Sequence, residues 1–191
     1  MLAFSDGVLA IIITIMVLEL HAPHEPTVAA LAPLWPVFLS YVLSFTYVAI
    51  YWNNHHHMLQ VTPRVNGAIL WANAHLLFWL SLLPFVTAWM GENHLAPAPT
   101  ALYGVVMVMA AIAYWLLQQA ILRECGPGSL LARAVGRDLK GKLSPLLYLA
   151  AIGLAWVHPG LSAALYVLVA LVWLVPDRRI ERVFPAEAAG E

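Results

Sequence analysis

Six apolar runs, separated by proline, glycine and charged residues, constrain this chain more than any other feature of its sequence. Each is as long as a membrane-spanning helix needs to be, or nearly so. The runs cover residues 3–20, 34–57, 66–90, 99–123, 143–157 and 160–176. The last two are short, and His158-Pro159-Gly160 between them predicts a tight turn, with a single re-entrant unit as the alternative. We therefore expect an all-α membrane protein with six transmembrane helices in residues 1–176 and a cytoplasmic tail over 177–191.

The composition excludes a soluble domain. Hydrophobic residues make up 62% of the 191 residues and charged residues only 10%, whereas soluble domains carry about 25% charged residues. A net charge of -1 offers no basic surface for nucleic acid. The single cysteine, Cys125, excludes an internal disulfide and a CxxC metal site.

The cations give the orientation. Arg64 lies between the second and third runs, five cations lie between the fourth and fifth, and three follow the sixth. The last two groups are Arg123, Arg133, Arg137, Lys140 and Lys142, and then Arg178, Arg179 and Arg182. All of them fall on one side of a six-span arrangement, so the positive-inside rule predicts that both termini are cytoplasmic.

The first run, MLAFSDGVLAIIITIMVLEL, has two different faces. At about 100° per residue, Ile11, Ile15 and Leu18 fall in one narrow stripe, and Asp6 lies roughly 140° from Ile11. A carboxyl directed into hydrocarbon costs about 2.5 to 3.5 kcal/mol. The face that carries Ser5 and Asp6 must therefore meet protein or water.

A cleaved signal peptide over this run is the alternative. Asp6, the lack of a basic segment before it and the poor cleavage site at His21-Ala22-Pro23 argue against that reading.

The motif Phe4-Ser5-Asp6-Gly7-Val8, followed by Ala10-Ile11, Thr14 and Val17-Leu18-Glu19, resembles the signature of the transmembrane protein 175 family, in its bacterial single-repeat branch. The resemblance implies a potassium-permeable channel of the bacterial inner membrane, a homotetramer in which the first helix of each subunit lines the pore. It implies that Ile11, Ile15 and Leu18 form a hydrophobic constriction. It also implies that Ser5 and Asp6 point away from the ion path and brace the helix. The family usually has an Arg four residues before the Phe of its motif. Counted back from Phe4, that position precedes Met1 of this sequence.

The second and third runs extend the resemblance and suggest what Ser5 and Asp6 meet. Trp52, Asn54, His55 and His56 match a W-x-N-H-H segment, and Asn73, Leu83, Pro84 and Phe85 match the third helix of the family. Trp52 and His56 are four residues apart and share one helical face, at the same inner boundary as Asp6. Imidazole and indole N–H groups can donate to a carboxylate. We expect Ser5 and Asp6 to bond to some of Trp52, Asn54, His55 and His56, with Asn73 as a further member. Pro84 should kink the third helix.

Each of these residues also has a simpler interpretation. Aliphatic residues at helical spacing usually pack helices together, and Ser5 and Asp6 are good N-caps. The Thr14 hydroxyl either bonds back to the carbonyl of Ala10 or faces a permeating cation. Glu19 is either an ordinary interfacial acid or part of a carboxylate ring at the outer mouth.

We expect a weakly selective leak channel without a cofactor other than permeant potassium ions. The sequence has no TVGYG filter, no arginine ladder for voltage and no catalytic motif, so we do not expect an enzyme. A pore closed by apolar rings blocks ions by dewetting, and potassium would pass more easily than sodium because the larger ion is dehydrated at lower cost.

Three alternatives stay open. In the first, the main permeant ion is the proton, since some members of the family are discussed as proton leaks and histidines titrate near neutrality. In the second, the chain is a membrane metalloprotein that uses His55, His56, His57 and His75. Consecutive helical residues point about 100° apart, which argues against three neighbouring histidines sharing one ion. Or it is a scaffold that conducts nothing.

Overall fold

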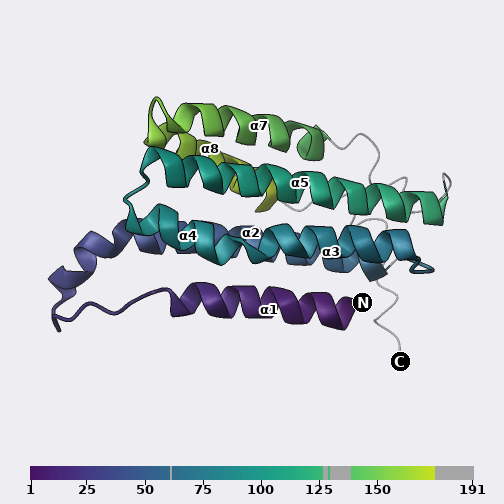
Figure 1. The fold of residues 1–191 in the computed structure, drawn as a ribbon, viewed down its shortest axis with the longest axis horizontal. Helices are drawn as coiled ribbons and strands as arrows, with labels where there is room; N and C mark the ends of the chain where they lie inside the picture. The colour runs from purple at the N-terminus through teal and green to yellow at the C-terminus, as the bar shows by residue number, and fades with distance from the viewer. Residues whose placement is uncertain (61, 127–128, 130–138, 175–191) are drawn as a thin grey trace.

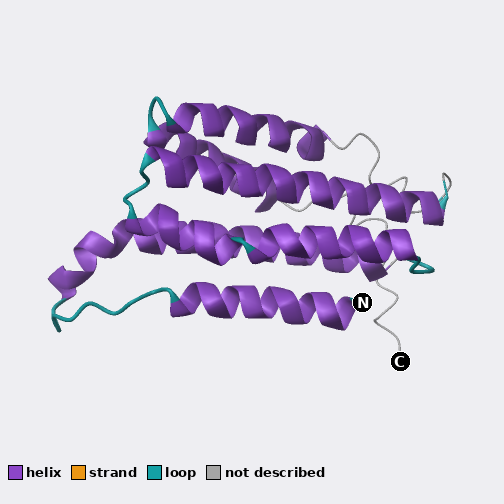
Figure 2. Cartoon of the chain, in the orientation of Figure 1, coloured by secondary structure: helices purple, strands orange, loops and turns teal. Residues whose placement is uncertain are grey.

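The computed structural model describes residues 1–60, 62–126, 129 and 139–174, and all of its described secondary structure is helical (Figure 2). The expected tail over 177–191, the last two residues of the sixth run and five of the cations lie outside the described residues. Those cations are Arg133, Arg137, Arg178, Arg179 and Arg182.

The helices follow the apolar runs. Their bounds are α1 Leu2–Leu18, η1 Val28–Leu34, α2 Trp35–Gln60, α3 Gly67–Ser81, α4 Leu83–Glu92, α5 Pro97–Cys125, α7 Leu139–Ala155 and α8 Pro159–Leu174. Among the described residues, three segments are long and apolar enough to cross a membrane, namely Val28–Gln60, Gly67–Glu92 and Pro97–Cys125. The helices α1 and α8 are apolar but shorter.

The third apolar run is broken into α3 and α4. The break is at Leu82, and Pro84 lies in the first turn of α4. Proline has no N–H to donate and its ring crowds the preceding turn, so a helix that reaches Pro84 has to break or kink. Helix α3 begins at Gly67 and is capped by Asn66, whose side chain accepts from the Ile69 N–H at 3.0 Å.

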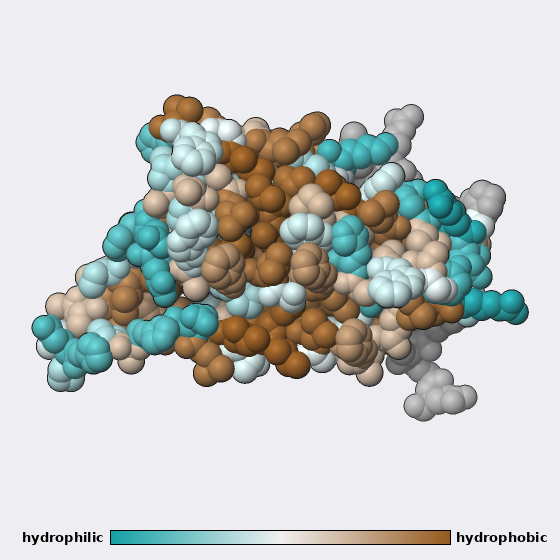
Figure 3. All heavy atoms as spheres, in the orientation of Figure 1, coloured by the Kyte–Doolittle hydropathy of each residue, from teal (hydrophilic) through white to brown (hydrophobic). Residues whose placement is uncertain are grey.

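Helix α1 lies at one edge of the bundle and α7 at the opposite edge (Figure 1). It contacts α2, α3 and α4, while α5 contacts α3, α4, α7 and α8. A band of hydrophobic side chains crosses the middle of the molecule between two hydrophilic ends (Figure 3). The α2–α3 connection, the end of α5 and the start of α7 lie at the same end as the N-terminus (Figure 1). These segments carry the cations of the described residues, which are Arg64, Arg123, Lys140 and Lys142.

Tyrosine side chains tie α8 to α2 and α5 in the core. The Tyr47 hydroxyl donates to the Tyr166 carbonyl at 2.6 Å, and the Tyr166 hydroxyl donates to the Thr100 carbonyl at 3.0 Å. The Tyr166 side chain fits because residue 104 is glycine. A Cβ there would overlap the Tyr166 hydroxyl and lie 2.6 Å from Ile152 Cγ1. These contacts hold α2, α5 and α8 together.

Candidate functional site

One face of α1 is buried in its own subunit. Ser5, Leu9, Ile12 and Met16 recur at intervals of four, three and four residues, and each is at most 3% exposed. This spacing marks one side of a helix, and that side meets α2, α3 and α4. The opposite side of α1 therefore has no neighbour among the described residues of its own chain.

The residues predicted to form the constriction are on that uncovered side. Ile11, Ile15 and Leu18 are 59%, 41% and 70% exposed in the single chain. Phe4, which is 67% exposed, belongs to the same stripe and was not predicted as part of it. Phe4 is seven residues before Ile11, which places the two about 20° apart around the helix. This spacing could have predicted that Phe4 belongs to the stripe. The stripe is defined here as Phe4, Ile11, Ile15 and Leu18.

The two polar residues beside the stripe are also exposed. The Thr14 hydroxyl donates to the Ala10 carbonyl at 2.9 Å, so it serves its own helix. Glu19 forms the C-cap of α1.

Ser5 belongs to a buried hydrogen-bond chain that joins three helices. The Asn73 amide donates to the Ser5 hydroxyl at 3.0 Å, and its oxygen lies 2.6 Å from the His55 Nε2. The three residues are 0%, 3% and 1% exposed. Because buried polar groups are costly when unpaired, this chain fixes α1 against α2 and α3 at one rotation and one height.

Asp6 makes a second connection closer to the surface. The Trp52 indole N–H donates to the Asp6 carboxylate at 3.0 Å, and the His56 Nδ1 lies 3.9 Å from the same oxygen. The Asp6 side chain is 36% exposed and that of His56 is 30% exposed. The other ring nitrogen of His56 lies 2.9 Å from the Gln60 amide. Asp6 therefore joins α1 to the end of α2.

Two interpretations from the sequence differ from the structure. Asn54 does not reach Ser5 or Asp6, because its amide donates to the Ile50 carbonyl of its own helix at 2.9 Å. Ser5 and Asp6 are not N-caps, because α1 begins at Leu2 and its N-cap, Met1, makes no side-chain cap bond.

The histidines have separate surroundings. His55 meets Asn73, His56 meets Asp6 and Gln60, and His75 accepts from the Trp79 indole N–H at 2.9 Å. Within the described ranges, no group of three or more His, Cys, Asp or Glu side chains is arranged to hold a metal ion.

Comparisons with known proteins give the family of this chain. Residues 1–84, which include the stripe as well as Ser5, Asp6 and their hydrogen-bond partners, match the family model for the endosomal/lysosomal potassium channel TMEM175. A potassium channel of Chryseobacterium sp. (strain P1-3) is 52% identical over 180 residues, which cover 94% of each chain. The endosomal/lysosomal proton channel TMEM175 of Danio rerio is 24% identical over 127 residues, 64% of this chain and 24% of the fish protein.

A solved structure resembles the whole fold. The crystal structure of a lysosomal potassium-selective channel TMEM175 homolog from Chamaesiphon minutus superposes with a TM-score of 0.78 at 27% identity. The match covers 92% of this chain and 95% of the other. With a bacterial relative 52% identical along nearly its full length, this chain belongs to the TMEM175 family.

Proposed function

We propose that this protein is a potassium-permeable, weakly selective leak channel of the bacterial inner membrane. Four copies, each with six transmembrane helices, surround a pore lined by their α1 helices. The observation that carries this proposal is the exposed stripe on α1, whose three aliphatic members are 41% to 70% exposed on a helix whose other side is buried. One helix forms one wall only, and closed symmetric assemblies complete such walls.

Closure of the pore needs no moving domain. Rings of Ile11, Ile15 and Leu18 from four copies form a narrow apolar constriction, which expels water and holds back ions that keep their hydration shell. Because nothing in these rings replaces the lost hydration, the ion that is easiest to dehydrate passes best. That ranking favours potassium over sodium, but only modestly.

The polar side of α1 serves the same function by holding the stripe in place. A rotation of one residue, about 100°, would direct Ser5 away from Asn73 and turn the stripe off the axis. The Ser5–Asn73–His55 chain and the Asp6–Trp52 bond both oppose such a rotation. We propose that these residues keep the constriction in register rather than touch the ions.

The cations support the orientation. The described Lys and Arg residues lie at the end of the bundle that holds the N-terminus, and cytoplasmic segments carry such residues in excess. The N-terminus of α1 is then cytoplasmic, and Glu19 lies at the outer mouth.

A proton channel is the second candidate. The fish relative is named a proton channel, and His56 lies beside Asp6 at the inner end of α1. This pair of ionisable side chains on α1 and α2 is the feature of the structure that favours the second candidate.

Ion flux in liposomes tests the proposal and ranks the ions. Reconstituted protein should carry potassium in the absence of valinomycin, and mixed gradients of potassium, sodium and protons should give reversal potentials that place potassium first. Ile11→Ser should raise the flux and reduce discrimination, because a hydroxyl makes the ring easier to wet. Leu146→Ser is the matched control, since Leu146 is 62% exposed on α7, at the opposite edge of the bundle.

A reversal potential that follows only the proton gradient would favour the second candidate. If Ile11→Ser and Leu146→Ser both leave the flux of the parent protein unchanged, the constriction does not lie on this face of α1.

A further inference from the structure

An apolar groove lies between α2 and α8, with the end of α4 at one end of it. Its cavity volume is about 410 Å³. A cavity of about 150 Å³ is already enough for a benzene ring, so by comparison the groove has room for a hydrocarbon chain of roughly fifteen carbons. Apart from Ser40 and Thr46, every residue that lines it is an alanine, valine, leucine or methionine.

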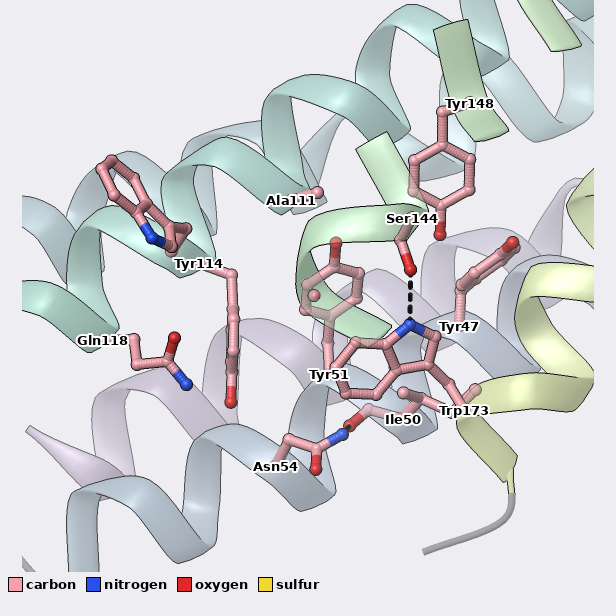
Figure 4. A pocket seen from close by; sticks show the side chains of 12 residues that line it. Tyr47, Ile50, Tyr51, Asn54, Ala111, Tyr114, Gln118, Ser144, Tyr148 and Trp173 are labelled. Carbon is pink, nitrogen blue, oxygen red and sulfur yellow. Dashed lines mark hydrogen bonds between the residues drawn. The ribbon is translucent and has the colours of Figure 1, made fainter. Parts of the chain in front are cut away.

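The groove opens on the outside of the subunit. Its lips are formed by aliphatic side chains that are 44% to 57% exposed, namely Leu39 and Val42 on α2 and Val167 and Leu171 on α8. Another side of α8 faces the interior of the subunit, where the Trp173 indole N–H donates to the Ser144 hydroxyl at 2.8 Å (Figure 4). Both helices are apolar, so the hydrocarbon of a surrounding bilayer has direct access to the groove.

The length and position of the groove match one leaflet of a bilayer. Leu95, which lines one end of it, follows the polar segment Glu92-Asn93-His94. That segment joins α4 to α5 at the end of the bundle opposite the N-terminus (Figure 1). From there the groove continues along α8 as far as Leu174. Its residues on α8, Ala163 to Leu174, span about 16 Å at 1.5 Å per residue, and half of the hydrocarbon core is about 15 Å thick.

One polar group of the groove has no partner. Ser40 is 2% exposed, and among the described residues its hydroxyl has no hydrogen-bond partner. The Thr46 hydroxyl, in contrast, donates to the Val42 carbonyl at 2.8 Å. A Cβ added to Gly91 would lie 3.4 Å from the Ser40 oxygen, and Gly91 directly precedes the polar segment. Ser40 therefore lies close to the depth at which the polar surface begins.

The chemistry of the groove selects the ligand. A buried hydroxyl without a partner costs free energy, and the ester carbonyl of a phospholipid is an acceptor that lies between the headgroups and the hydrocarbon. A free fatty acid fits less well, because no Asp, Glu, Lys or Arg lines the groove and a carboxylate there would have no counter-charge.

We propose that the groove binds one acyl chain of a membrane phospholipid, with the ester carbonyl of that chain accepting from Ser40. The site is separate from the stripe, because no residue of α1 lines it. It needs a chain that lies in a membrane and does not depend on which ion the channel passes.

Native mass spectrometry of the full-length protein in detergent tests the site. The protein is stripped of lipid and titrated with dipalmitoyl phosphatidylcholine, and one tightly bound phospholipid per chain is expected. Ala163→Phe fills the groove and should weaken this binding at least tenfold. Ala164→Phe is the matched control, because Ala164 is the next residue of α8, is exposed and does not line the groove. It should bind as the parent does.

An ether lipid with the same chains keeps the test decisive even if Ala163→Phe fails to fold. It has no ester carbonyl, so the parent should bind it severalfold more weakly than the ester lipid. Ser40→Ala should lose this difference, because it has no hydroxyl to donate. The proposal is overturned if Ala163→Phe and the parent bind phospholipid equally, or if the parent does not distinguish the ester lipid from the ether lipid. It is also overturned if Ala163→Phe dissociates the subunits and keeps the lipid, since a second copy of the chain would then cover the groove.

Discussion

Replacement of Asn73 by leucine should loosen α1 from its subunit. Asn73 is 3% exposed and is the central member of the chain that joins Ser5 to His55. Leucine has a similar size and can neither donate nor accept. Among the described residues, the Ser5 hydroxyl would keep only its 3.3 Å contact with the Met1 carbonyl. The His55 Nε2 would lose the Asn73 oxygen that lies 2.6 Å from it.

The expected loss of stability follows from these two stranded groups. A buried polar group left without its partner costs about 1 to 3 kcal/mol. Because Ser5 keeps a weak alternative and His55 does not, Asn73→Leu should lower the free energy of unfolding by about 2 to 4 kcal/mol. Addition of Ser5→Ala to Asn73→Leu should cost less than Ser5→Ala alone, since contacting residues are not additive.

Chemical unfolding of the detergent-solubilised protein, followed by circular dichroism, measures this effect. Asn54→Leu is the matched control, because Asn54 is half-buried on α2 and its amide donates to the Ile50 carbonyl of its own helix. Its cost should stay within about 0.5 kcal/mol. Equal stability of Asn73→Leu and Asn54→Leu would refute the reasoning, and so would strict additivity of Asn73→Leu with Ser5→Ala.

Two more predictions concern packing and the second connection of α1. Gly104→Ala should lower the stability by about 1 to 3 kcal/mol through overpacking against Tyr166, measured by the same unfolding assay. Gly153→Ala, where nothing lies within 4 Å of an added Cβ, should be neutral or slightly stabilising; equal losses in the two variants would contradict this. Trp52→Phe removes the N–H that meets Asp6, and because Trp52 is 45% exposed the loss should stay below about 1 kcal/mol. In an Asp6→Asn background it should be smaller still, and a larger loss there would show that the indole acts through some other contact.

The sequence predicted the helical class correctly, because this class depends on long apolar runs, and such runs are a local property of the sequence. The helix break near Pro84 could also be predicted, because the missing N–H is a property of proline itself and does not depend on its neighbours. The short helix η1 was not anticipated. It begins after Thr27, whose side chain accepts from the Ala30 N–H, and contains Pro33, within a segment that the sequence presented as part loop and part span.

Partners across helices were harder to assign. Asn54 and Asn73 are equally polar, and the chain position of Asn54 beside His55 made it the more obvious partner for α1. The structure instead has Asn73 of α3 between Ser5 and His55, on a side of α3 where Leu76 and Leu80 are also buried. Helical spacing gives the faces of one helix and does not give the rotation of its neighbour.

Block of potassium flux by silver ions at Ile15→Cys tests the central claim most directly. The variant is made in a Cys125→Ser background, so that the new thiol is the one cysteine in the sequence, and thiolates bind soft cations. If four Ile15 side chains surround the ion path, silver should abolish the flux through Ile15→Cys and leave the Cys125→Ser parent unaffected. Leu149→Cys, on a residue 54% exposed on α7, should behave like the parent. Undiminished potassium flux through Ile15→Cys in the presence of silver would contradict the claim that α1 lines the pore.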